Sequence, residues 1–160
     1  MDKATAPNGI HDFDGIFGEW DIRNRTLKVR LGGSDDWTEF PSHAKARSIL
    51  NGAGNMDEIH FSTKGYTGGT LRLFNRETKE WWIYWMTDRD GVLQPPVVGH
   101  FESGRGVFYG DDVYDGKPIR VRYIWSNITE TSAQWEQAFS LDKGRTWETN
   151  WTMDMTRTAR

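Results

Sequence analysis

The chain has 160 residues, of which 36% are hydrophobic and 14% aromatic, with a formal net charge of −3 at pH 7. This length suits one domain with its own core, and the acidic balance argues against nucleic acid as a partner, because surfaces that bind it are basic. The absence of cysteine excludes disulfides, thiolate metal ligands and a cysteine nucleophile.

The beginning of the chain gives no targeting signal. Residues 1–7 are polar and lack the apolar segment of a signal peptide, and no run of the sequence approaches the roughly 20 apolar residues of a membrane-spanning helix. We therefore expect a single cytoplasmic domain over residues 1–160, with residues 1–10 as a flexible N-terminus and with no membrane partner.

Residues 10–17 can form a short helical turn, and the rest of the chain reads as consecutive hairpins. Glycine-containing turn sequences separate ten apolar-polar alternating segments, which predict strands at 19–30, 37–49, 56–62, 69–75, 80–87, 96–102, 106–110, 118–126, 133–140 and 147–156. Many antiparallel strands in one small domain must close or pair, since open edges would expose unpaired backbone groups. The sequence predicts an all-β fold, a single antiparallel up-and-down β-barrel of about eight to ten strands.

Gly18-Glu19-Trp20 opens the first strand, and Arg157 lies near the end of the last. This arrangement resembles that of calycins, the superfamily of lipocalins and fatty-acid-binding proteins, and implies a barrel floor plugged by Trp20 under Arg157. The chain from about His11 to Arg157 also resembles an uncharacterised, mostly bacterial family of calycin-like proteins, a domain of unknown function. That resemblance implies the fold and supplies no reaction. The stretches that carry it include Gly54-Asn55-Met56-Asp57-Glu58, Ile83-Tyr84-Trp85, Trp135-Glu136-Gln137-Ala138-Phe139 and Thr146-Trp147-Glu148-Thr149-Asn150-Trp151.

Most of the nine tryptophans fall at alternate positions within the expected strands. Period two places alternate side chains on one face of a strand, so these rings share the inner face of the barrel. The residues that this alternation selects as ligand-binding are Asn24, Trp85, Trp125, Trp135, Thr149 and Trp151, with Tyr109 added although neighbouring glycines make its orientation ambiguous. The sequence therefore predicts an aromatic cavity for a small hydrophobic or aromatic ligand.

Asp57 is the inward residue that suggests chemistry. A carboxylate on an apolar inner face loses hydration, which favours its protonated form, so it can exchange a proton near neutral pH. Tyr123 and Gln137 would orient a substrate or bind an oxyanion. This set predicts a cofactor-independent cyclase, isomerase or lyase. The alternatives are that Asp57 caps the turn at residues 51–54, that the barrel is a carrier without catalysis, or that side chains fill it as a solid scaffold.

The same alternation divides the other strands between the two faces of the barrel. In the strand at 69–75 it places Leu71 and Leu73 inside and Arg72 among the charges of a solvated outer face. The inverted assignment would instead bury a polar cluster, made of Arg72, Arg122, Glu136 and Tyr84. The face formed by Trp82, Tyr84 and Met86 keeps this alternative open, since two large aromatic side chains facing solvent need a reason, and a homodimer formed through this sheet is the simplest one.

The four histidines show no spacing typical of a metal site, so neither a metal nor a cofactor is expected. Some calycin-like barrels hold heme through one histidine, and His100, which follows Pro95-Pro96-Val97-Val98-Gly99, is the candidate for that alternative.

Residues 140–147 match the Asp-box pattern S-x-D-x-G-x-T-W, which is known from sialidases and other propeller proteins. Propellers repeat it in successive blades, whereas this chain carries it once. We interpret it as a hairpin device in which Asp142 binds the amides of the turn, Gly144 takes a positive φ and Trp147 packs under the loop.

Overall fold

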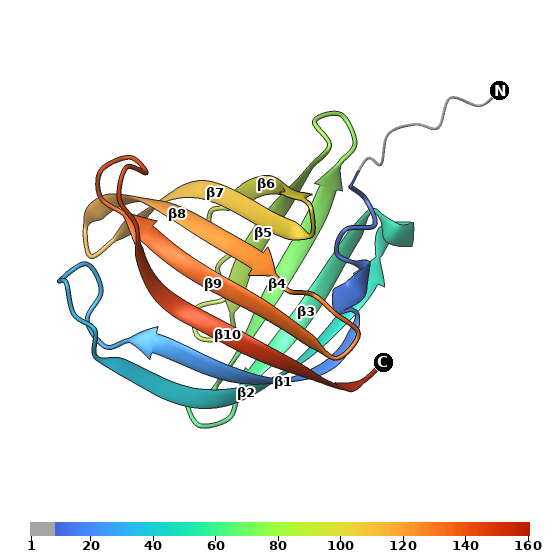
Figure 1. The fold of residues 1–160 in the computed structure, drawn as a ribbon, viewed down its shortest axis with the longest axis horizontal. Coiled ribbons are helices and arrows are strands. Elements are labelled where there is room, and N and C mark those ends of the chain that lie inside the picture. The colour runs from blue at the N-terminus through green and yellow to red at the C-terminus, as the bar shows by residue number, and fades with distance from the viewer. Residues whose placement is uncertain (1–8) are drawn as a thin grey trace.

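The computed structural model describes residues 9–160 as a closed antiparallel β-barrel, in which each strand pairs with the next along the chain and the last pairs with the first (Figure 1). Its strands are β1 (Gly18–Leu27), β2 (Trp37–Ile49), β3 (Gly54–Phe61), β4 (Tyr66–Asn75), β5 (Glu80–Thr87), β6 (Val97–Glu102), β7 (Arg105–Tyr114), β8 (Lys117–Ser126), β9 (Ser132–Ser140) and β10 (Glu148–Ala159). The prediction of an all-β, up-and-down barrel is confirmed.

The remaining regular structure is short. The helical turn expected before the first strand is η1 (Asp14–Ile16), and η2 (Leu50–Gly52) joins β2 to β3. The flexible segment predicted for residues 1–10 falls almost entirely outside the described residues. Within residues 9–160, no helix has the length and apolar character needed to cross a membrane.

Alternating strand directions gather the loops at two ends of the barrel. The loops after β1, β3, β5, β7 and β9 lie at one end, which we call the mouth. Two of them, after β1 and β9, project at the left of Figure 1. The other end, which carries η1 and the C-terminus at the right of the same view, is the floor.

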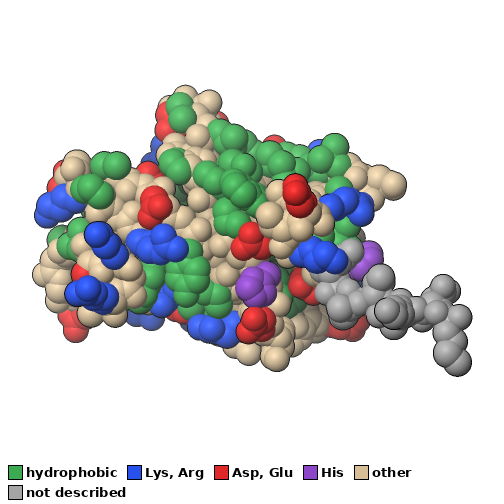
Figure 2. All heavy atoms as spheres, turned by 90° about the horizontal axis from the view of Figure 1, so that it is seen from above, with side chains coloured by type: hydrophobic (Ala, Val, Ile, Leu, Met, Phe, Trp, Pro, Cys, Tyr) green, Lys and Arg blue, Asp and Glu red, His purple; other side chains and the backbone are tan. Residues whose placement is uncertain are grey.

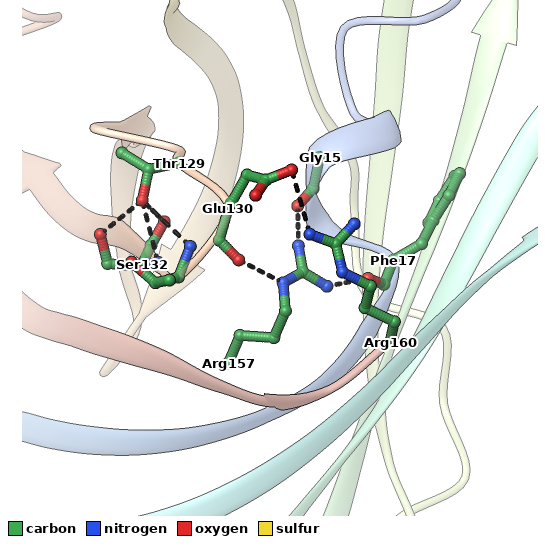
Figure 3. A network of polar contacts seen from close by, with 8 residues as sticks. Gly15, Phe17, Thr129, Glu130, Ser132, Arg157 and Arg160 are labelled. Carbon is green, nitrogen blue, oxygen red and sulfur yellow. Dashed lines mark hydrogen bonds and ion pairs between the residues drawn. The ribbon is translucent and has the colours of Figure 1, made fainter.

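Trp20 closes the floor. Its side chain is 0% exposed, its Nε1 donates to the carbonyl oxygen of Ile16 at 2.8 Å, and the Arg157 guanidinium carbon lies 4.3 Å from the centre of its ring. The same guanidinium donates to backbone carbonyl oxygens of Gly15, Phe17 and Glu130 (Figure 3). This is the tryptophan-under-arginine arrangement that the calycin resemblance implied, and it fastens η1 and the β8–β9 loop across the end of the barrel.

The assignment of faces in β4 was wrong. Arg72 is 2% exposed and points into the barrel, while Leu71 and Leu73 are half-buried on the outside, opposite Tyr84 and Trp82 of β5. Hydrophobicity alone favoured the leucines as the inward residues. The charge of Arg72 is neutralised from the adjacent strand, which an alternation within one strand cannot reveal.

A bulge in β10 contradicts the inward orientation predicted for Thr149. The pairing of β10 with β9 shifts between Thr149 and Trp151, so Asn150 rather than Thr149 is buried, at 0% exposure. Gln137 Nε2 donates to Asn150 Oδ1 at 2.9 Å. Thr149 therefore does not take the inward place expected for it, because the extra residue of a bulge breaks the period of two.

The Asp-box forms the turn expected of it. The Asp142 carboxylate accepts hydrogen bonds from the backbone N–H groups of Arg145 and Thr146 at 3.1 and 2.8 Å and from the Thr146 hydroxyl at 2.6 Å. These donors hold the pKa of Asp142 well below its usual range. Gly144 has φ +88°, and a Cβ at this position would lie 3.3 Å from the Trp147 ring. The motif shapes the β9–β10 hairpin, in agreement with its interpretation as a structural device.

The outer surface carries aromatic residues as well. Trp82, Tyr84 and Met86 of β5 are half-buried there, and a view of the molecule from above shows hydrophobic side chains gathered among charged ones (Figure 2). The homodimer proposed from the sequence stays a prediction.

Candidate functional site

The interior of the barrel contains a cavity of about 520 Å³ that reaches the mouth. Side chains therefore do not fill the barrel, contrary to the solid-scaffold alternative. Four of the predicted residues form what we call the aromatic wall of this cavity: Trp85, Trp135, Trp151 and Tyr123. Trp125, Asp57 and Gln137, which the sequence also placed inside, line the cavity too.

The rings of the aromatic wall hold one another nearly at right angles. The ring centre of Trp151 lies 6.0 Å from that of Trp85, with an angle of 88° between the ring planes. It lies 5.3 Å from the ring centre of Trp135, with an angle of 89°. Asn24 lies behind this wall and fixes it: its Oδ1 accepts from Trp151 Nε1 at 3.0 Å, and its Nδ2 donates to Ser42 Oγ at 2.8 Å. Asn24 thus positions a ring and does not itself line the cavity.

Gly68 keeps part of the cavity open. A Cβ at this position would lie 2.1 Å from the ring of Trp85, so the indole packs directly against the backbone of β4. Any larger residue at position 68 would displace the ring, because so short a separation is forbidden between carbon atoms. The glycine therefore sets how far Trp85 projects inward.

A buried ion pair lies deeper in the barrel. Asp57 Oδ2 accepts from Arg72 Nη2 at 2.6 Å, and the two side chains are 7% and 2% exposed. Arg72 Nη1 donates to Asn55 Oδ1 at 2.9 Å, and the guanidinium lies 5.1 and 5.3 Å from the ring centres of Phe13 and Trp125. The inward orientation of Asp57 agrees with the sequence, and its partner is Arg72 rather than the backbone of the turn at residues 51–54.

The ion pair leaves some hydrogen-bonding capacity unused. Asp57 Oδ1, Arg72 Nε and Asn55 Nδ2 are buried without a hydrogen-bond partner among the described residues. Unpaired buried polar atoms are rare in folded proteins and indicate an ordered water or a functional contact. The carboxylate thus retains an acceptor oxygen beside the cavity.

Burial raises the pKa of Tyr123, and the nearby carboxylate of Asp112 raises it further. The phenol therefore keeps its proton well above neutral pH and can donate a hydrogen bond into the cavity. The sequence analysis did not select Asp112, which lines the cavity from β7, because the strand expected at 106–110 ended before it.

The elevated pKa of Tyr123 predicts a loss of stability in alkali. An unfolded chain releases a tyrosine proton near pH 10, whereas the folded protein retains it, so the stabilisation is present below pH 10 and decreases as the pH rises towards the pKa of the folded state. Tyr123→Phe removes this contribution, so the free energy of unfolding of the variant should fall less steeply between about pH 10 and 11.5, by at most about 1.4 kcal/mol per pH unit. Melting temperatures measured across this pH range should show the same flattening. Tyr109→Phe is the surface control, and equal slopes for the two variants would contradict the prediction.

Loop residues that the sequence analysis did not select line the mouth. They include the basic residues Arg30 of the β1–β2 loop, Lys64 of the β3–β4 turn and Arg89 of the β5–β6 loop. Strand periodicity gives no information about such residues. The signal available in the sequence was their position in loops that must meet at one end of an up-and-down barrel.

Three other predicted residues lie away from the cavity. Tyr109 is 39% exposed on the outer surface, where its ring centre is 5.8 Å from that of Trp147, so its assignment to the inside was wrong. Thr149 does not line the cavity, because of the bulge. His100 is exposed, with Nε2 3.0 Å from Glu102 Oε1, and this outward position gives no support to a heme ligand inside the barrel. The described residues contain no cluster of side chains suited to a metal ion.

No protein-family model matches the chain, and no curated protein matches it in sequence. Among solved structures, the chain is similar to the crystal structure of Rv2717c from M. tuberculosis, with a TM-score of 0.59 and 9% sequence identity over 96% of this chain and 98% of that one. At this identity the likeness shows a common barrel fold.

Proposed function

We propose that the protein binds a small, largely apolar molecule with an aromatic part in the cavity of the barrel. The observation that carries the proposal is the open volume of about 520 Å³ beside the aromatic wall. Protein interiors normally pack with few voids larger than a water molecule, whereas ligand pockets have volumes of about 300–1,000 Å³ and are lined by aromatic and apolar groups with a few polar ones. The arrangement of Trp20 and Arg157 supports membership of the calycin superfamily as part of the same proposal.

Native mass spectrometry of protein purified gently from its own host tests for a bound organic molecule directly. A neutral fluorescent probe, N-phenyl-1-naphthylamine, tests the site in the purified protein. Thr26 lines the cavity near the mouth, so the larger side chain of a Thr26→Trp variant would occupy part of the cavity. We expect it to weaken probe binding by about tenfold or more, which corresponds to about 1.4 kcal/mol of binding free energy.

Thr156→Trp is the matched control, because Thr156 is exposed on the outside of β10. It introduces the same side chain and is expected to leave the probe affinity within about twofold, as surface substitutions usually do. Equal affinity of the probe for the Thr26→Trp and Thr156→Trp variants would place the probe outside the cavity and refute the proposal.

The second candidate is a cofactor-independent isomerase, cyclase or lyase that uses the same cavity. It is favoured by the unpartnered Oδ1 of Asp57, which would accept a proton, while Tyr123 donates to a developing oxyanion. Gln137 would orient the substrate through its amide oxygen, since its Nε2 already donates to Asn150. The molecule recovered by mass spectrometry should then be converted by the wild type and not by a folded Asp57→Asn variant. Equal conversion would exclude Asp57 as the base.

A further inference from the structure

Three basic side chains line the mouth without a direct ion pair to a described residue. Arg30, Lys64 and Arg89 line the cavity, and none of them makes an ion pair with another described residue, since the ion pairs of residues 9–160 join other groups. They come from three different loops. Lys and Arg side chains gather at the left end of Figure 2, the end at which the mouth lies.

Aromatic rings hold these cations in place. The guanidinium carbon of Arg89 is 3.8 Å from the ring centre of Tyr66, and that of Arg30 is 5.5 Å from the ring centre of Phe139. The Nζ of Lys64 is 4.6 Å from the ring centre of Phe40. A cation over a ring face is attracted to it by about 0.5–1 kcal/mol at an exposed site, and the contact leaves its N–H groups free to donate elsewhere.

The charges of two of these cations both act on the Tyr66 hydroxyl. Burial raises the pKa of Tyr66, while Arg89 and Arg30 both act to lower it. Both charges therefore lie within electrostatic range of the same phenol oxygen. Lys64 precedes Tyr66 by two residues at the β3–β4 turn, and all three cations line the same cavity.

The acidic residues nearby make their direct contacts with groups other than these three cations. Asp111 accepts from Arg120 on the outer surface at 3.3 Å, and Asp90 and Asp112 accept from backbone N–H groups at 3.1 and 2.7 Å. Glu148, whose charge acts on Arg30, accepts from the backbone N–H of Leu31 at 2.6 Å. Burial lowers the pKa of Arg30, so this guanidinium has lost hydration that no carboxylate of the described residues replaces by direct contact.

We propose that the molecule bound in the cavity carries an anionic group, a carboxylate or a phosphate, which Arg30, Lys64 and Arg89 bind at the mouth while its apolar part contacts the aromatic wall. The inference rests on the proposed function of the cavity. Charge-assisted hydrogen bonds are the strong ones, and a planar guanidinium matches the geometry of both anions. Arg72 is already paired with Asp57, so the cations of the cavity that make no direct ion pair with a described residue are those at the mouth.

Probes that share one aromatic system and differ in charge separate the contribution of the anionic group to binding from that of the aromatic part. 2-Naphthoate, 2-naphthyl phosphate and the neutral 2-naphthamide share one aromatic system, and isothermal titration calorimetry with the full chain measures their affinities. We expect the better of the two anions to bind about tenfold or more tightly than the amide, because a hydrogen bond to a charged group contributes about 1.5–3 kcal/mol. Comparison of naphthoate with naphthyl phosphate then decides which anion the mouth prefers.

Charge-removing variants locate the effect. Arg30→Gln, and separately Lys64→Gln combined with Arg89→Gln, should each reduce the preference for the anion about tenfold, with the amide affinity changed by less than about twofold. Arg76→Gln is the control, since Arg76 is exposed in the β4–β5 turn at the floor. Equal binding of anion and amide by the wild type, or equal losses for both in the variants, would overturn the inference and leave the cavity proposal intact. Failure of all three probes and of N-phenyl-1-naphthylamine to bind would overturn both.

Discussion

Replacing Asp57 with asparagine is expected to lower the free energy of unfolding by about 3–5 kcal/mol. The substitution keeps the shape of the side chain and removes its charge, which leaves the guanidinium of Arg72 without a counter-ion at 2% exposure. An uncompensated charge in the interior is among the few single-residue changes with so large an effect. Urea-induced unfolding followed by tryptophan fluorescence measures the change.

Arg72→Met provides the complementary measurement. Met retains part of the packing against Phe13 and Trp125, and the variant alone should also be destabilised by about 3 kcal/mol, because Asp57 is then unpaired. The double variant Asp57→Asn/Arg72→Met should regain most of the loss, since an apolar replacement of a whole buried ion pair is often close to neutral. Additive losses in the double-mutant cycle would contradict direct coupling of the two charges.

Trp20→Ala is expected to cost about 3–5 kcal/mol of unfolding free energy. The indole is 0% exposed, and its removal would leave a cavity at the floor, the carbonyl oxygen of Ile16 without its donor and the guanidinium of Arg157 without its ring. Thermal unfolding followed by circular dichroism at 220 nm measures the loss.

Trp37→Ala is the matched control for Trp20→Ala. It removes the same atoms from a half-buried ring at the start of β2, which contacts Arg25 at 5.0 Å. A loss of about 1 kcal/mol or less is expected there, the range for an exposed contact between a cation and a ring. Similar losses for Trp20→Ala and Trp37→Ala would mean that Trp20 does not close the floor as the structure indicates.

The sequence predicted the fold well because strand formation in this chain is encoded locally. Glycine-containing turns and a period of two located the strands, and the expected range 80–87 coincides with β5. The aromatic wall followed from the same alternation, since Trp85 and Trp135 lie in regular parts of their strands and Trp151 keeps the period of two with Met153 after the bulge. Its inward orientation depends on nothing beyond the pleat of each strand.

The parts of the site that sequence analysis missed depend on contacts between strands. Arg72 can point inward because Asp57 neutralises it from β3, and the bulge at Thr149 exchanges one inward side chain for another. Arg30, Lys64 and Arg89 lie in loops, where no period applies. An inward aspartate that needs a cation was the one signal in the sequence that pointed towards Arg72.

The pairing between β5 and β6 has a kinetic consequence. It joins only Trp81, Trp82 and Ile83 to the facing residues of β6, whereas every other pair of adjacent strands is held by a longer ladder. Local opening of a protein takes the route that breaks the fewest contacts, so the barrel should open most readily between β5 and β6. The time that a bound molecule stays inside would then depend on the backbone hydrogen bonds of this short seam, and residence time and affinity could be altered by separate substitutions.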